Sequence, residues 1–154
     1  MDKLDLTTIQ DITNDFCTEL KNRLVSNGTN ASGDLSKSIK GIVKQDGKYI
    51  NISISLEDYW KYIENGTKPH FPPLDAIKKW ISVKPVLPRP LKNGKLPTIN
   101  QLSYLIGRSI SKKGTLPKPF LAPTLSEFNL VGKVYDEVMN LINKQLTEEI
   151  NEEL

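Results

Sequence analysis

The sequence predicts an α+β fold in which a small antiparallel β-sheet is packed by several helices, with a long C-terminal helix. Residues 4–25 and 123–152 repeat apolar side chains at the spacing of one helix face. Between them, two short runs with β-branched residues flank Asp46-Gly47, a pair typical of a hairpin turn. We therefore expect one curved hairpin that helices cover on one side.

The chain of 154 residues has the size of one domain, and we expect residues 1–154 to form a single one. Hydrophobic residues make up 38% and charged residues 25%, as in ordinary globular proteins. The one cysteine, Cys17, leaves no internal disulfide and suits a reducing cytoplasm. No apolar run approaches the ~18 residues of a membrane span, and the acidic, amphipathic start is unlike a signal peptide, so we expect no membrane partner.

The net charge of +3 is unevenly distributed along the chain. Residues 61–118 have twelve basic and two acidic side chains, whereas residues 119–154 have two basic and seven acidic ones. One interpretation is a lysine-rich solvated face. The other is a basic surface that meets an acidic partner or passing DNA.

The first predicted helix, residues 4–25, has a single apolar stripe. Its members are Ile9, Ile12, Phe16, Leu20 and Leu24. Cys17 lies beside this stripe, which favours a small core residue over a reactive thiol. Residues 26–34 have turn and linker composition, and the hairpin runs 38–43 and 49–55 follow. In the second run Ile50, Ile52 and Ile54 alternate with polar residues, so one strand face should be buried.

The stretch "YIENGTKPHFPP", residues 62–73, should join two helices. Asn65-Gly66 can end a short helix over residues 56–64, because glycine accepts the left-handed conformation of a C-cap. Residues 67–73 should be extended, since residues before proline avoid the helical region. Pro73 can then begin a helix over residues 73–82.

Residues 82–97 contain four prolines and no apolar period, so we expect an exposed arm, with a loose hairpin turn at Asn93-Gly94. Thr98 and Gln101 form a capping box that should begin the next helix. Gly107 inside that helix indicates a close packing contact, because glycine otherwise destabilises a helix.

The last predicted helix is continuous from about Pro123 to residue 152. Its apolar stripe is formed by Leu125, Phe128, Val131, Tyr135, Val138, Ile142, Leu146 and Ile150. Thirty residues would extend roughly 45 Å, farther than so small a domain can cover. The far end should therefore protrude or meet another chain.

His70 is the one histidine of the chain, and the sequence offers it no catalytic partner. A catalytic or metal-binding histidine needs a nucleophile, a carboxylate or further ligands held in fixed geometry. Phosphate-loop, Cys/His metal and Gly-x-Ser-x-Gly patterns are absent from the sequence. We predict no catalytic, metal or cofactor residue. His70 is instead expected to be a turn residue among prolines and aromatic side chains, with Tyr59, Trp60, Tyr62 and Trp80 nearby.

The order of these motifs resembles the tail-completion or head–tail joining (neck) proteins of tailed double-stranded DNA bacteriophages. In that family an aromatic–Glu–x–Gly–Thr stretch leads into a Pro–His–x–Pro–Pro helix start, and a later Gly–Thr–x–Pro–x–Pro–Phe–Leu–x–Pro segment leads into the C-terminal helix. The matching residues are Tyr62, Glu64, Gly66, Thr67, Pro69, His70, Pro72 and Pro73, then Gly114, Thr115, Pro117, Pro119, Phe120, Leu121 and Pro123. The resemblance covers residues 33–125, and the proline-rich arm departs from it.

The resemblance implies a structural virion protein of the neck or tail, assembled in the host cytoplasm, with no enzymatic activity. The implied partners are further copies in a ring, often a hexamer, and a neighbouring connector, tail-terminator or tail-tube protein, with DNA in the channel as a non-specific contact. In this interpretation residues 62–73 present an aromatic surface, and the apolar arm residues Val86, Leu87, Leu91 and Leu96 reach a neighbouring subunit or ring protein. The alternative is a non-specific DNA-binding module that uses residues 61–118.

Overall fold

The computed structural model describes residues 4–30, 32–84 and 86–153, and these confirm the α+β prediction. They form seven helices and one two-stranded antiparallel sheet. In chain order the elements are α1 (Thr7–Ser26), α2 (Asp34–Ser38), β1 (Lys40–Asp46), β2 (Tyr49–Ser55), α3 (Trp60–Asn65), α4 (Leu74–Val83), α5 (Ile99–Lys113), α6 (Leu121–Phe128) and α7 (Leu130–Glu153).

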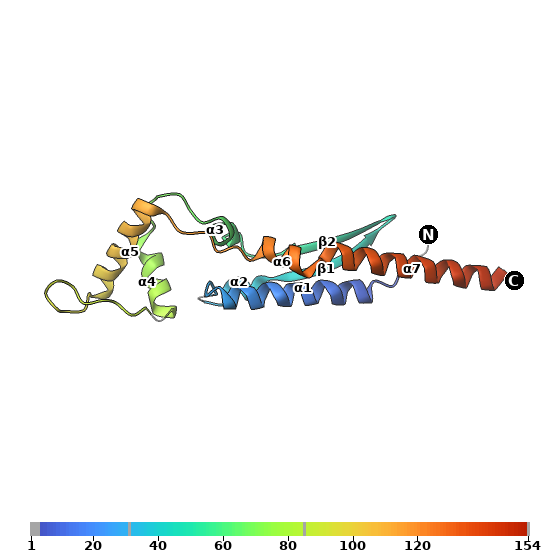
Figure 1. The fold of residues 1–154 in the computed structure, drawn as a ribbon, viewed down its shortest axis with the longest axis horizontal. Helices are drawn as coiled ribbons and strands as arrows, with labels where there is room; N and C mark the ends of the chain where they lie inside the picture. Colours follow the sequence, from blue (N-terminus) through green and yellow to red (C-terminus); the bar gives the residue numbers. More distant parts are fainter. Residues whose placement is uncertain (1–3, 31, 85, 154) are drawn as a thin grey trace.

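The molecule is elongated, with two parts that α3 and two extended segments connect (Figure 1). α1, the hairpin, α6 and α7 lie side by side in a body, whereas α4, α5 and the arm form a smaller lobe at the other end. The far end of α7 extends past α1, as the sequence predicts for the protruding end.

The core of the body forms around α1. Ile9, Phe16, Leu20 and Leu24 are fully buried, and Cys17 is buried beside them, which confirms the predicted stripe. The core also contains Leu35, Ile39, Phe120 and Leu130, so it joins α1 to α2 and to the segments that begin α6 and α7. α1 begins at Thr7 rather than at residue 4, because the Asp5 carboxylate accepts hydrogen bonds from the N–H and hydroxyl of Thr7.

The second strand of the hairpin lies at 49–55 as predicted, whereas the first lies at 40–46 instead of 38–43, since Ser38 ends α2. α1 packs on the inner face of the hairpin. Asp46 pairs with Tyr49, so the turn residues are Gly47 and Lys48, with Gly47 at φ 58°. The alternation of half-buried and exposed residues in both strands matches the predicted single inner face. Gly41 allows the close approach, since a Cβ there would lie 2.4 Å from Cγ2 of Thr13.

The smaller lobe consists of α4 packed on α5. The predicted capping box is present, with the Thr98 hydroxyl accepting from the Gln101 N–H. The prediction for Gly107 is also confirmed, because a Cβ there would lie 3.1 Å from Cζ of Phe71 and 3.3 Å from Cδ1 of Ile77. α4 begins one residue after Pro73, which is its N-cap, and continues to Val83.

The prediction of one continuous helix from Pro123 is wrong. Asn129 adopts the left-handed conformation, with φ 55° and ψ 49°, and separates α6 from α7. Both helices pack on α1. α7 has 24 residues and therefore extends about 36 Å.

Candidate functional site

Two Gly-Thr segments that are far apart in the sequence cross each other at the connection between body and lobe. Thr67 and Thr115 form an isolated antiparallel bridge, with N–H to C=O distances of 3.1 and 3.2 Å. Their hydroxyl oxygens lie 2.9 Å apart. Residues 62–73 and 114–120 thus form one unit, which we call the crossed joint. The resemblance motifs contain both halves of this unit.

Both glycines of the crossed joint are required by its geometry. Gly66 and Gly114 each have φ 69°, in the left-handed region that favours glycine. A Cβ on Gly66 would lie 2.3 Å from the Thr115 carbonyl oxygen, and one on Gly114 would lie 2.0 Å from that of Thr67. Each glycine therefore allows the other segment to approach, so the two motifs depend on each other.

Glu64 caps a helix that begins 57 residues later. Its Oε2 accepts the N–H groups of Phe120 and Leu121 at 2.7 and 2.9 Å, and its Oε1 accepts that of Ala122 at 3.0 Å. The first N–H groups of a helix lack partners within the helix, and its dipole favours a negative charge there. Phe120 is the N-cap of α6 and its side chain makes no capping hydrogen bond, so Glu64 performs that role. The same contact holds Phe120 in the core, where it is fully buried.

His70 has a structural place in the crossed joint. Its ring is exposed, and Nδ1 donates to the Lys68 carbonyl at 2.9 Å. Its backbone N–H makes a 3.4 Å contact to the carbonyl of Ile110 at the end of α5. Pro69 is exposed, Pro72 is half-buried, and Pro73 is the N-cap of α4. These contacts fix the path of the chain from α3 to α4.

The second half of the crossed joint is tied to α3 and to the linker after α1. The Lys118 N–H donates to the Ile63 carbonyl at 2.8 Å, and the Asn27 amide donates to the Pro119 carbonyl at 3.1 Å. Pro117 and Pro119 are exposed, so their rings restrict the backbone without filling the core.

A groove of about 720 Å³ opens beside the crossed joint. Its aromatic lining comes from Tyr59, Tyr62 and Trp80, each at least 39% exposed. Partial burial, followed by the carboxylates of Asp34 and Glu57, raises the pKa of Tyr59. Tyr59, Tyr62 and Trp80 are thus exposed in one groove, whereas Trp60, which the sequence predicts beside them, packs against the core.

The sequence predicts a basic surface within residues 61–118 but not that part of it lines this groove. Lys79, Lys84 and Lys118 line it, and the Lys84 ammonium donates to the Gly28 carbonyl at 2.6 Å and lies 5.6 Å from the Trp80 ring centre. These residues come from α4, the start of the arm and the crossed joint. The sequence pattern has no signal that brings them together with residues 28–35.

Beyond Lys84, which lines the groove, the arm is separated from the crossed joint by the length of α4 and α5 (Figure 1). Leu87 is 94% exposed and Leu96 is 63% exposed, while Val86 and Leu91 are half-buried. The predicted turn is present, with the Leu91 N–H donating to Lys95 and that of Gly94 to Leu91. Ser82 and Val83 belong to α4, so the arm is shorter than predicted and starts at residue 84.

The described residues hold no group of three or more His, Cys, Asp or Glu side chains that could bind a metal ion. Among the same residues, no helix is long and apolar enough to cross a membrane. Comparison of the chain with protein-family models, with curated proteins and with solved structures finds no match.

Proposed function

We propose that this protein is a structural component of the virion of a tailed bacteriophage, which docks as a ring at the head–tail junction and joins the tail to the DNA-filled head. The proposal combines the motif resemblance with the place of the motif residues in the molecule. Glu64, Gly66, Thr67 and Gly114 all act on the backbone of the crossed joint. Such residues set the relation between two parts of a subunit and need no chemical step.

The observation that supports this proposal most is the amount of exposed surface. The chain has an accessible surface of 10926 Å² for a mass of 17.4 kDa. A compact monomer of that mass exposes about 7,900 Å². The excess of about 3,000 Å² is in the range that stable assemblies bury. The exposed surface includes large apolar side chains such as Leu116 and Val131, which are 85% and 78% exposed.

The proposal is tested in a phage that encodes this chain. A nonsense codon in the gene should give filled heads and separate tails in the lysate, and supplying the protein in trans should restore joined particles. Cryo-electron microscopy of the intact particle should show the chain as a closed ring at the neck. Joined, infectious particles that lack the protein would contradict the proposal.

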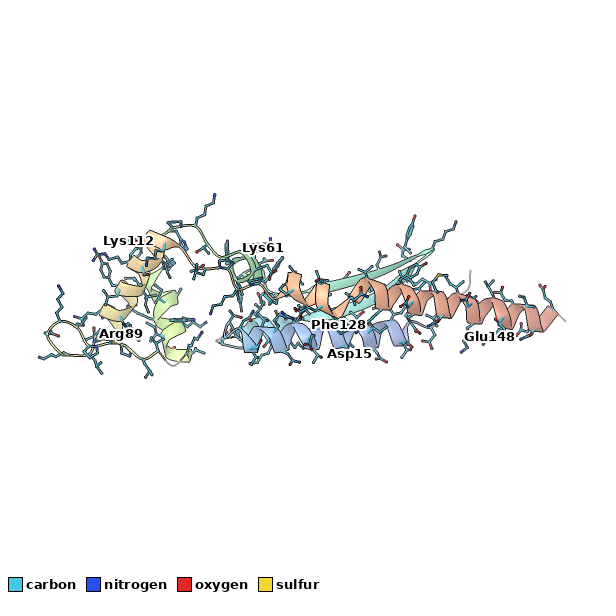
Figure 2. The ribbon with its side chains drawn as sticks, in the orientation of Figure 1. Asp15, Lys61, Arg89, Lys112, Phe128 and Glu148 are labelled. Carbon is cyan, nitrogen blue, oxygen red and sulfur yellow. The ribbon has the colours of Figure 1, made fainter. Side chains whose placement is uncertain are left out.

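A second candidate, non-specific DNA binding, is favoured by the position of the positive charge. The labelled Arg89 and Lys112 lie in the smaller lobe and Lys61 lies in α3, whereas Glu148 lies near the far end of α7 (Figure 2). One of the two acidic residues of segment 61–118, Glu64, is already engaged as a helix cap. Retention of duplex DNA that falls steeply with salt would support this candidate. No retention at low salt would exclude it.

A further inference from the structure

The overhang of α7 and the groove beside the crossed joint have complementary properties. We define the overhang as residues 146–153, because every one of them is exposed and Gln145 is the last half-buried residue of α7. The overhang contains four glutamates and no basic residue. Leu146 and Ile150 are 51% and 59% exposed. Their spacing of four residues places them on one face of the helix, about 6 Å apart.

The groove offers an apolar surface with a positive rim. Exposed side chains of Tyr62, Trp80 and Leu116 contribute the apolar part. The charged lining residues are Lys79, Lys84 and Lys118 against one carboxylate, Asp34. A volume of about 720 Å³ is too small for a whole helix but suits the side chains of one helix face.

We propose that the overhang of one copy docks in the groove of a second copy. Leu146 and Ile150 would enter the apolar part, and the glutamates would face the lysine rim. A charge of −4 on the overhang opposes a net +2 among the charged groove residues. This sign complementarity is the reason for choosing a second copy as the occupant.

The geometry excludes docking within one chain. α7 leads away from the crossed joint, so the overhang lies at one end of the elongated molecule, whereas the groove lies between the body and the smaller lobe (Figure 1). The contact is therefore head-to-tail, between two different patches, and it repeats from copy to copy. Such contacts close into a ring or continue as a filament. The inference rests on the proposed function only for the expectation that the ring closes.

Charge reversal on each side tests the contact. Lys79→Glu with Lys118→Glu changes the groove, and Glu148→Lys with Glu149→Lys changes the overhang. Each variant alone should weaken self-association at least about tenfold in Kd, measured by sedimentation velocity at low salt. All these side chains are exposed, so the fold should persist, which circular dichroism checks.

An equal mixture of the two variants provides the decisive result. The reversed overhang then meets the reversed groove, and the native overhang meets the native groove, so association should return toward the wild-type Kd. Lys112→Glu with Lys113→Glu is the matched control, since it reverses two exposed lysines of the smaller lobe outside the groove. It should leave the Kd unchanged.

Three results would overturn the inference: a wild-type chain that stays monomeric at low salt up to the highest soluble concentration, single variants that associate like the wild type, or a mixture that stays dissociated. Replacing Ile150 with Ser should also weaken association without unfolding the chain, because this side chain is exposed. The two proposals can fail separately. If the chain associates through this contact but phage lacking it still form joined particles, the proposed function is wrong and the contact stands.

Discussion

Gly66 and Gly114 are the residues at which one added methyl group should do most damage. Gly66→Ala and Gly114→Ala combine a left-handed backbone with a Cβ at 2.3 or 2.0 Å from a carbonyl oxygen of the opposite segment. We expect each substitution to lower the free energy of unfolding by more than about 2 kcal/mol. Urea denaturation followed by circular dichroism would measure the loss.

Gly94→Ala is the matched control for both glycines. Gly94 also has a positive φ, 74°, but a Cβ there would meet no heavy atom within 4 Å. Gly94→Ala should therefore lower the free energy of unfolding by only about 1 kcal/mol, which is the cost of a left-handed backbone at a residue with a Cβ. If Gly66→Ala and Gly94→Ala lower the free energy of unfolding equally, the crossed joint can shift to accommodate the added methyl group. The close approach of its two segments would then not require glycine.

Glu64 should contribute to stability through a helix distant in sequence. Glu64→Ala leaves three N–H groups at the start of α6 without their carboxylate, and the cost should be about 2 kcal/mol. Glu64→Gln should recover only part of this, because its amide nitrogen is a donor where an acceptor is needed. Thermal unfolding of both variants would measure the difference.

The exposed Glu57→Ala is the control for the loss of one negative charge near α3. It should change stability by less than about 0.5 kcal/mol. If Glu64→Ala changes stability as little as Glu57→Ala does, water can replace the carboxylate at the start of α6 without cost. The capping role of Glu64 would then be wrong.

The sequence singles out these residues but not their roles. Glu64, Gly66, Thr67 and Gly114 belong to motifs, and the C-cap conformation of Gly66 follows from its place after α3. Their partners lie 47 to 58 residues away, the nearest being Gly114 with Thr67 and the farthest Glu64 with Ala122. Local propensity cannot specify such pairs, since no turn or helix period relates the two positions.

Among the elements, the helices and strands with strong local signals were predictable, and the break between α6 and α7 was not. Asn129 lies within an apolar pattern that continues across it, so the period gave no reason to end a helix there. Asparagine tolerates the left-handed conformation better than most residues, but most asparagines do not adopt it, so its presence alone does not predict a break. As a result, Val131 and Tyr135 of the predicted stripe are 78% and 63% exposed, and half-buried Val134 lies toward the core instead.

The arm should matter for assembly more than for folding. Replacing residues 86–95 with a short Gly-Ser link keeps the Lys84 contact to Gly28 and removes Leu87, whose side chain is 94% exposed. Loop closure depends weakly on length, so the isolated chain should lose less than about 1 kcal/mol. Under the function proposed above, joining of tails to filled heads should fall, because the proline-rich arm loses less entropy on docking than a flexible Gly-Ser link does. Particle counts by electron microscopy would measure this.

Leu87→Ser is the matched point variant for the arm replacement. It should impair joining while leaving thermal unfolding unchanged. Loss of folding in the shortened chain would make the arm part of the core. A normal yield of joined particles would mean that the arm has no role in assembly.

At the scale of the whole molecule, the segregation of charge along the sequence becomes a segregation in space. Segment 61–118 includes the smaller lobe and most of the crossed joint, and the acidic segment 119–154 includes α6 and α7 (Figure 2). The sequence could not predict this elongated form, because helix and strand patterns specify elements without their relative placement. Two parts joined by a narrow connection also explain the large exposed surface.

This arrangement predicts that association of the chain weakens as salt rises. Contacts between a +10 segment and a −5 segment are attractive, and ordinary ionic strength screens exposed charges over about 8–10 Å. Apolar contacts respond in the other direction, since excluded salts such as sulfate strengthen burial. Sedimentation velocity in sodium chloride should therefore show dissociation, and a neutral osmolyte at equal osmolality, the control, should not. If association stays constant from low to high sodium chloride, the segregated charges do not contribute to association and form only a solvated surface.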